Sequence, residues 1–143
     1  MIAAATPALA IGHAIGRIGC FLVGDDYGRP TDLSWGVAFP EGLPPTTVPV
    51  HPTQLYEAAA LAILAVLLIR WRRAGFADEV VLGRYLAIAG AIRFAIEFVR
   101  VNERVAGPFT LAHLISLALV VAGIVLLVGA SSSQRVPQPR RSR

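Results

Sequence analysis

The stretch FTLAHLISLALVVAGIVLLVGA, at residues 109–130, decides the kind of fold that this chain adopts. It contains no charged side chain, and its most polar one is that of His113. A helix needs about 20 apolar residues to cross the hydrocarbon core of a membrane, and this stretch is long enough to do so. The chain is therefore predicted to be a membrane protein with one span here.

Three further runs have the apolar content of spans, namely Ile2–Val23, Leu55–Trp71 and Val80–Val99. Their apolar residues are continuous over long stretches instead of alternating with polar ones, which favours helices over sheets. The sequence therefore predicts an all-α fold, a polytopic transmembrane bundle of about four helical spans that occupies residues 1–130. The remaining residues, 131–143, are rich in Ser, Pro and Arg, and this composition predicts a disordered basic tail.

The composition excludes several classes of protein. Of 143 residues, 55% are hydrophobic and 15% charged, whereas soluble domains have about 25% charged residues. The net charge of +4 does not indicate nucleic-acid binding, because the arginines are spread over loops, spans and tail instead of one soluble face. A single cysteine, Cys20, excludes an internal disulfide. No cofactor is expected.

The positions of the arginines predict an orientation in the membrane. Basic residues favour the cytoplasmic side, which places the connection at 70–73 and the tail at 131–143 in the cytoplasm. Both assignments agree with four spans and an inside N-terminus. The long acidic loop at 24–54 then lies outside. Arg17, His51 and Arg93 are predicted to meet at this outer face, although they are far apart in the sequence.

A charged side chain stands within an apolar segment at Arg17, in the motif GRIGCFLVGDDYGR of residues 16–29. Insertion of such a charge to membrane depth costs about 2.5–3.5 kcal/mol, so it requires an anionic partner. One interpretation is that Arg17 binds a lipid phosphate. The alternative is a salt bridge to Asp25, Asp26 or Glu97.

Arg93, Glu97 and Arg100 follow one another at spacings of four and three residues, so they share one face of a helix. Two interpretations remain open. The three charges form an ion ladder that locks helices together, or they form a cradle for a lipid headgroup. Two arginines and one glutamate leave one net positive charge, which suits one phosphodiester.

The motif HPTQLYE at residues 51–57 has the pattern of a helix start, because Pro52 is well suited to a first turn. His51 titrates near neutral pH and is a candidate acid or base. Tyr56 is a candidate headgroup contact. The alternative is a helix start at the membrane interface, with Tyr56 in the aromatic belt.

Three nearby side chains have less specific patterns. His13 lies four residues before Arg17 and is interpreted as a packing or hydrogen-bonding group, with a role as a base as the alternative. Cys20 is interpreted as a small apolar filler, with a reactive thiol or thiol sensor as the alternative. Asp25 and Asp26 are adjacent, but no further ligands are spaced to complete a metal site, so no metal is expected.

Taken together, these motifs resemble the prolipoprotein diacylglyceryl transferase family. The resemblance covers nearly all of residues 8–128. The residues that carry it are Gly16–Gly19, Phe21, Gly24, Gly28, Arg29, His51–Glu57, Arg93, Phe94, Glu97 and Arg100. It implies a bacterial inner-membrane enzyme that moves the diacylglyceryl group of phosphatidylglycerol to the lipobox cysteine in the signal peptide of a prolipoprotein. The reaction makes a thioether and releases glycerol phosphate.

The resemblance also implies roles for single residues. Arg17 matches the phospholipid-binding arginine of the family, Arg93 and Glu97 match an essential charged pair, and Gly28 matches a glycine of the signature loop. The catalytic residues expected on this basis are Arg17, His51, Arg93 and Glu97. The residues expected to bind the headgroup are Arg17, Gly28, Arg29, Tyr56, Arg93 and Arg100.

The chain departs from the family pattern in ways that leave a second reading open. The family usually has asparagine at the positions of Cys20 and Val23, and glutamate at that of Asp25. The N-terminal half of the family, with a histidine that is a favoured base, has no counterpart, so His51 or His13 would have to substitute. The chain is therefore expected to be a fragment, a truncated homologue or part of an oligomer. The alternative function is a non-catalytic phospholipid-binding or assembly module.

Overall fold

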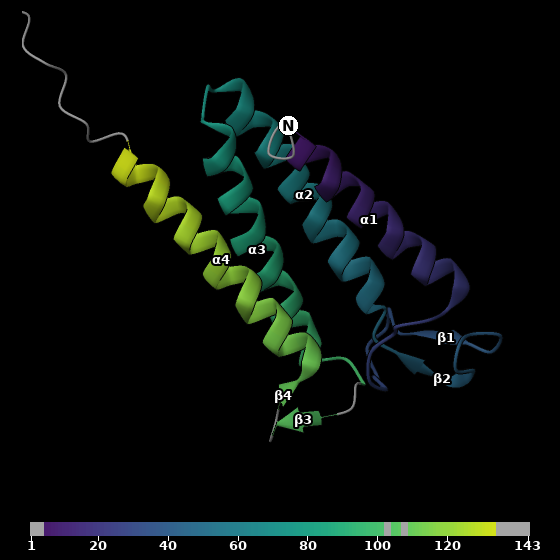
Figure 1. Ribbon diagram of the computed structural model, residues 1–143. Helices are drawn as coiled ribbons and strands as arrows, with labels where there is room; N and C mark the ends of the chain where they lie inside the picture. The colour runs from purple at the N-terminus through teal and green to yellow at the C-terminus, as the bar shows by residue number, and fades with distance from the viewer. Residues whose placement is uncertain (1–4, 102–103, 107–108, 134–143) are drawn as a thin grey trace, which may run out of the picture.

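The computed structural model of the protein describes residues 5–101, 104–106 and 109–133. In this part of the chain, four helices lie side by side and alternate in direction (Figure 1). They are α1 (Thr6–Val23), α2 (Thr53–Arg73), α3 (Asp78–Glu97) and α4 (Leu111–Ser133). Each helix covers one of the predicted spans. The fold class predicted from the sequence, an all-α helical membrane bundle, is confirmed.

Three of these helices, α1, α2 and α4, are long and apolar enough to cross a membrane. Helix α3 is not among them, because Arg84, Arg93 and Glu97 all fall within its apolar part. It packs between α2 and α4 (Figure 1). The charges of α3 are thus carried by a helix with neighbours on both sides, where they can find partners.

Two short antiparallel hairpins, which the sequence did not predict, lie beyond the helices. One pairs β1 (Val37–Phe39) with β2 (Thr46–Val50), and the other pairs β3 (Arg104–Ala106) with β4 (Phe109–Thr110). Strands of two to five residues are too short to leave a clear alternating pattern in the sequence. Both hairpins lie at the same end of the bundle, here called the hairpin end (Figure 1).

Small residues allow the helices to approach one another closely. Ala10 and Ala14 of α1 belong to one buried core with leucines of α2. Between α3 and α4, a Cβ built at Gly90 would lie 2.8 Å from the carbonyl oxygen of Ser116, and one at Gly123 would lie 2.5 Å from the nitrogen of Ala87. Close packing at small residues is a main source of association between membrane helices.

A tight turn at the end of α1 positions the candidate site. Gly24 has a φ of 73°, a left-handed conformation that glycine adopts at little cost, and its N–H donates to the carbonyl of Cys20 at 2.9 Å. Asp26, two residues later, also has a positive φ of 58°. The hydroxyl of Thr53 donates to the carbonyl of Asp26 at 3.0 Å, which fixes this turn against the start of α2.

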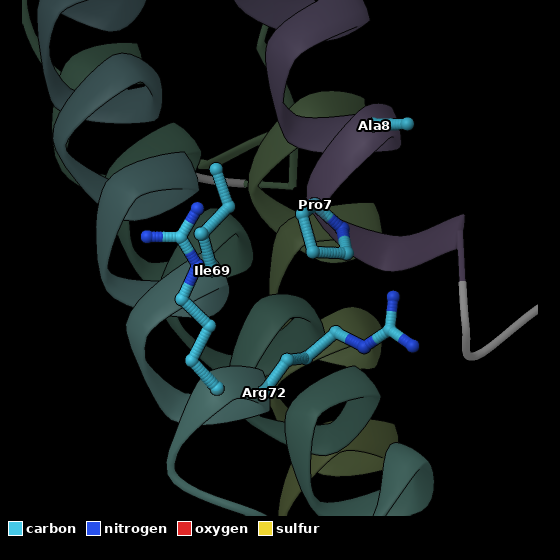
Figure 2. Close-up of a pocket in the computed structure, with 5 residues that line it drawn as sticks. Pro7, Ala8, Ile69 and Arg72 are labelled. Carbon is cyan, nitrogen blue, oxygen red and sulfur yellow. The ribbon is translucent and has the colours of Figure 1, made fainter.

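At the opposite end, a pocket of about 450 Å³ lies where the start of α1 meets the end of α2 (Figure 2). Pro7, Ile69 and Arg72 are among its lining residues. Helix α4 ends here at Ser133, so it extends beyond Ala130, where the boundary of the tail was predicted. Residues 134–143 of that predicted tail lie outside the described residues.

Candidate functional site

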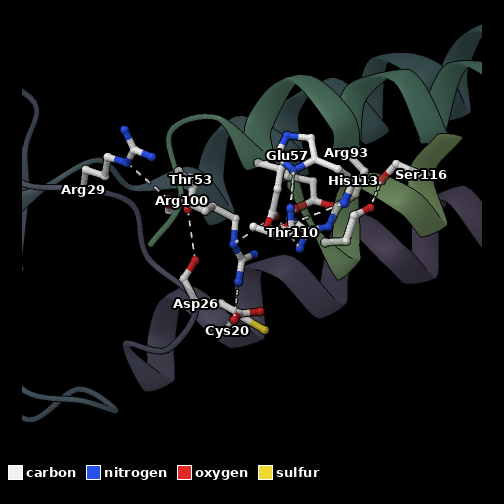
Figure 3. Close-up of polar contacts among 12 residues, drawn as sticks. Cys20, Asp26, Arg29, Thr53, Glu57, Arg93, Arg100, Thr110, His113 and Ser116 are labelled. Atoms are coloured by element: carbon white, nitrogen blue, oxygen red, sulfur yellow. Dashed lines mark hydrogen bonds and ion pairs between the residues drawn. The ribbon is translucent and has the colours of Figure 1, made fainter. Parts of the chain in front are cut away.

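Six charged side chains form a closed ring of ion pairs at the hairpin end (Figure 3). They come from α1, α2, α3 and the loops that follow α1 and α3. We call them the charge ring: Arg17, Asp26, Glu57, Arg93, Glu97 and Arg100. Positive and negative charges alternate around it, so each guanidinium lies between two carboxylates and the ring as a whole is neutral.

Glu57 lies on α2 and forms ion pairs with arginines of both α1 and α3. One oxygen of Glu57, Oε2, lies 3.1 Å from Nε of Arg17 and 3.8 Å from Nη1 of Arg93. Nη2 of Arg93 in turn lies 3.0 Å from Oε2 of Glu97. The side chain of Glu57 is only 2% exposed, and a charge so deeply buried is tolerated only with close partners of opposite sign.

Asp26 closes the ring on its outer side. Nη1 of Arg17 lies 3.1 Å from Oδ2 of Asp26, and Arg100 pairs with the other oxygen of the same carboxylate. Nε of Arg100 also lies 3.7 Å from Oε2 of Glu97. Figure 3 shows Arg100 reaching toward Asp26 from its loop. A single loop carboxylate therefore bridges two arginines that belong to different parts of the chain.

The members of the ring differ sharply in exposure. The side chain of Glu97 is fully buried and that of Arg100 is 3% exposed, whereas that of Asp26 is 46% exposed. Burial by itself raises the pKa of Asp26, but the positive charges of Arg100 and Arg17 outweigh it, so this pKa lies below its usual value of 3.8. Asp26 is thus an ionised carboxylate at the accessible side of the ring.

A pocket of about 320 Å³ opens beside Asp26 and Arg100, and Gly28 lines it. The N–H of Gly28 donates to the carbonyl of His51 at 2.8 Å. A Cβ at Gly28 would lie 2.8 Å from side-chain atoms of His51 and Thr53. Any larger residue here would push the loop away from the start of α2, and so move Asp26.

Three of the predicted site residues, Arg29, His51 and Tyr56, make contacts other than the ion pairs of the charge ring. Nδ1 of His51 lies 3.3 Å from the hydroxyl of Tyr56, and that hydroxyl accepts a hydrogen bond from Nε1 of Trp35 at 2.8 Å. Nε of Arg29 donates to the carbonyl of Arg100 at 3.4 Å, and its side chain is exposed. Within the described residues, none of these contacts joins His51 or Tyr56 to the charge ring.

The ring brings together Arg17, Arg93, Glu97 and Arg100, which the sequence singled out, and adds partners that it did not. Glu57 was assigned no site role, although it ends the HPTQLYE motif. Asp26 was named among possible partners of Arg17, which it proves to be. His13 was interpreted as a packing or hydrogen-bonding group, and its Nε2 lies 3.5 Å from Oε1 of Glu57.

Thr110 of β4 and His113 of α4 contribute a support that no sequence pattern indicated. The hydroxyl of Thr110 donates to Oε1 of Glu97 at 2.7 Å, and the N–H of Thr110 donates to Nδ1 of His113 at 3.2 Å. Both side chains are buried, and His113 packs against the rings of Phe94 and Phe98. Figure 3 shows Thr110 and His113 approaching the ring from the α4 side.

Cys20 lies beside the ring, with its sulfur 3.7 Å from Nη1 of Arg17. Cys20, Asp25 and Asp26 offer ligand atoms that lie within 4.8 Å of one another. Arg17 and Arg100 already supply positive charge to Asp26, which disfavours a metal ion at the same place. We therefore assign no metal to these three residues.

Comparison with known proteins gives the family. The sequence pattern of prolipoprotein diacylglyceryl transferase matches residues 1–129. The chain is 37% identical over 127 residues to a protein of Geobacter sulfurreducens named phosphatidylglycerol–prolipoprotein diacylglyceryl transferase, with 85% of this chain and 48% of that protein covered.

Proteins of the same name from Methylococcus capsulatus and Pseudomonas putida are 36% and 34% identical, over 130 and 139 residues. These matches cover 87% and 93% of this chain, and 48% and 52% of the relatives. The chain thus spans about half the length of the curated relatives it matches. It belongs to the prolipoprotein diacylglyceryl transferase family.

Proposed function

We propose that the chain carries the phospholipid-binding part of a diacylglyceryl transferase in the bacterial inner membrane. The substrates are phosphatidylglycerol and the lipobox cysteine of a prolipoprotein signal peptide. The sulfur of that cysteine attacks the glycerol carbon, the carbon–oxygen bond to phosphate breaks, and glycerol phosphate leaves. The observation that carries the proposal is the charge ring, in which an exposed carboxylate, Asp26, bridges Arg17 and Arg100.

In this proposal the lipid phosphate takes the place of the Asp26 carboxylate. Arg17 and Arg100 then bind the phosphate oxygens, and the pocket beside Gly28 receives the headgroup. Negative charge grows on the phosphate as the carbon–oxygen bond breaks, and preorganised guanidinium groups stabilise it. Glu57 and Glu97 hold Arg17 and Arg93 in place, so the free-energy cost of reorganising the site for the lipid is small.

The thiol of the lipobox cysteine needs a base, and two histidines are candidates. His51 was predicted from its motif, and it contacts Tyr56. His13 was the other candidate base predicted from the sequence, and its ring is 40% exposed and lies against Glu57. The adjacent carboxylate orients the imidazole, which favours His13 as the base. Comparison of His13→Gln with His51→Gln in the assay below separates the two.

The test is a transfer assay on the purified chain in phosphatidylglycerol vesicles, with a lipobox peptide as acceptor. Arg17→Ala is expected to reduce transfer by about 100-fold or more, since it removes a donor to the developing negative charge. The control is Arg70→Ala, which removes an exposed arginine at the other end of the bundle. Transfer by Arg17→Ala at the rate of the unmodified chain would refute the proposal.

A second candidate function is a phospholipid-binding or assembly module without catalysis, because the arginines of the charge ring suit an anionic headgroup whether or not transfer follows. This candidate predicts Arg17-dependent binding of phosphatidylglycerol by the chain without thioether formation. We further propose that the charge ring faces the outside of the cell and the C-terminus the cytoplasm.

A further inference from the structure

Three aromatic side chains at the hairpin end are joined by hydrogen bonds, outside the charge ring. Nε1 of Trp35 donates to the hydroxyl of Tyr56 at 2.8 Å, and the same hydroxyl lies 3.3 Å from Nδ1 of His51. Trp35 precedes β1, His51 follows β2, and Tyr56 lies in the first turn of α2. We call these three residues the aromatic triad. Trp35 has no role in the site as described so far.

The donors and acceptors of the aromatic triad fix the direction of its hydrogen bonds. An indole N–H can only donate, so the oxygen of Tyr56 accepts from Trp35. The hydroxyl of Tyr56 still has its own proton to donate. Within the described residues, the acceptor in contact with it is Nδ1 of His51. Nδ1 therefore offers a lone pair, and the proton of the neutral imidazole is on Nε2.

The other neutral tautomer of His51 would leave a polar group unsatisfied. With its proton on Nδ1, His51 would donate to the oxygen of Tyr56, which would then receive two donors. The hydroxyl proton of Tyr56 would have no acceptor among the residues that the structure describes. Tyr56 is partly buried, and an unmade hydrogen bond there costs free energy. The contacts of the aromatic triad therefore favour the proton on Nε2.

The backbone of His51 is held beside the pocket that opens next to Asp26 and Arg100. Its N–H donates to the carbonyl of Arg29 at 3.0 Å, and its carbonyl accepts from the N–H of Gly28 at 2.8 Å. Gly28 lines the pocket, and a Cβ built at Gly28 would lie 2.8 Å from Cβ of His51. An imidazole N–H beside this pocket suits an anionic headgroup, whose oxygens are acceptors.

A tight turn places Trp35 against Tyr56. The N–H of Gly36 donates to the carbonyl of Leu33 at 2.9 Å, and a Cβ at Gly36 would lie 3.0 Å from the side chain of Thr31. Trp35 is 57% exposed, so burial does little to fix its position. Tryptophan is common at membrane interfaces, but the interface alone does not direct an indole N–H to one hydroxyl. The hydrogen bond to Tyr56 is thus the contact that orients Trp35.

We propose that Trp35 and Tyr56 are positioning residues, which hold His51 in the tautomer with its proton on Nε2. His51 then donates a hydrogen bond from Nε2 to an oxygen of the phospholipid headgroup. It is not the base for the thiol, because Nδ1 already accepts from Tyr56 and Nε2 has no lone pair to offer. The step at the headgroup rests on the function proposed above, whereas the tautomer does not depend on lipid.

The tautomer is tested by nitrogen-15 NMR of the whole chain in micelles, with the ring nitrogens of its histidines labelled. The spectrum is taken at about pH 8, because an ordinary imidazole has a pKa of about 6.5 and is neutral there. The chain has three histidines, and the signals that His51→Gln removes are those of His51. Protonated and unprotonated ring nitrogens differ widely in chemical shift. We expect Nε2 of His51 to be protonated and Nδ1 to be unprotonated.

Two variants remove the donors of the aromatic triad one at a time. Tyr56→Phe removes the hydroxyl, and Trp35→Phe removes the indole N–H but keeps an aromatic ring. Each is expected to convert the single tautomer of His51 into a mixture, which brings its two nitrogen shifts closer together. Trp71→Phe, at the far end of α2, and Tyr85→Phe, in α3, are the matched controls. They are expected to leave the shifts of His51 unchanged.

Lipid binding tests the role of the N–H at Nε2. The side-chain amide of glutamine can donate near the position of Nε2, whereas leucine has a similar size and cannot donate. Equilibrium binding of phosphatidylglycerol to the purified chain is expected to be unchanged in His51→Gln. It is expected to be about tenfold weaker in His51→Leu, because a hydrogen bond to a charged oxygen is lost.

Three results would overturn the proposal. The first is a proton on Nδ1 of His51, or an equal mixture of tautomers, in the unmodified chain. The second is a spectrum of His51 that either Tyr56→Phe or Trp35→Phe leaves unchanged. The third is equal binding of lipid by His51→Gln and His51→Leu, which would mean that Nε2 donates no hydrogen bond to the headgroup. None of them alters the expected effect of Arg17→Ala, so failure here is distinguishable from failure of the proposed function.

Discussion

Glu57 is the residue on which most of the charge ring depends. One oxygen of its carboxylate pairs with Arg17 and Arg93, and the other oxygen pairs with His13. All three partners belong to other helices. Removal of one member of a buried ion pair is far more costly than replacement of the whole pair, because the partner charges stay buried without compensation. The ring therefore acts as a unit, and the carboxylate that pairs with three other side chains has the largest effect on stability.

Glu57→Gln preserves the shape of the side chain and removes its charge. It is expected to lower the free energy of unfolding by about 3–5 kcal/mol, since Arg17 and Arg93 lose a shared buried partner. Thermal unfolding of the detergent-solubilised chain measures this change. Glu41→Gln, at an exposed loop position, is the matched control. Equal melting temperatures for the two variants would contradict the central place of Glu57.

Asp26 gives a prediction about pH. Its pKa is lowered in the folded chain, and a carboxyl of this kind contributes stability that is complete above its unfolded pKa and is lost as the pH falls through the folded pKa. The stability difference between the unmodified chain and Asp26→Asn is therefore expected to be constant from about pH 7 to about pH 5, and to shrink only below about pH 4. Melting temperatures of both proteins over this range measure it. A difference that disappears near neutral pH would show that Asp26 is not held ionised.

At the scale of the elements, α3 and α4 are joined by contacts between backbones. A Cβ at Gly123 would lie 2.6 Å from the carbonyl oxygen of Gly83, and one at Gly90 would meet Ser116. This packing holds α4 where Thr110, just before its first turn, reaches Glu97 of α3. The closeness of the two helices is therefore coupled to the geometry of the charge ring.

Gly123→Leu is expected to destabilise the chain by about 1–3 kcal/mol, because the new side chain forces α3 and α4 apart. Gly129→Leu makes the same substitution in the same helix at a position with open space, and it is expected to have little effect. Unfolding of both variants by denaturant in mixed micelles gives the comparison. Similar losses in the two would contradict a specific role of the α3–α4 contact, because leucine has a higher helix propensity than glycine at both positions.

At the scale of the whole molecule, the alternating direction of the helices separates two polar ends. The charge ring and both hairpins lie at one end, and the arginines that end α2 lie at the other (Figure 1). Because the helices between them include three that are long and apolar enough to cross a membrane, we expect the two ends to face different compartments. The excess of arginine at 70–73 favours the cytoplasm for that end.

Single cysteines introduced into a Cys20→Ala chain test this orientation. Ser34→Cys, in the loop at the hairpin end, is expected to react with a membrane-impermeant maleimide in intact spheroplasts. Ala74→Cys, directly after α2, is expected to react only after the membrane is permeabilised. Both positions are exposed, so a difference in labelling reports sidedness. The reverse pattern would place the charge ring on the cytoplasmic side and would contradict the proposed orientation.

The sequence alone determined the helices, their place in a membrane and the family, since each depends on local patterns: long apolar runs, residues spaced along one helix face, and two dense motifs. It also singled out Arg17, Arg93, Glu97 and Arg100. Only the tertiary structure decided that Glu57 joins Arg17 to Arg93, that Asp26 closes the ring, and that Thr110 of β4 supports Glu97. The physical reason is the distance along the chain over which a sequence pattern is informative. Helix periodicity relates residues within a few turns of one helix. Contacts between helices depend instead on how their faces pack, and the close approach that glycines and alanines allow decides which charges meet.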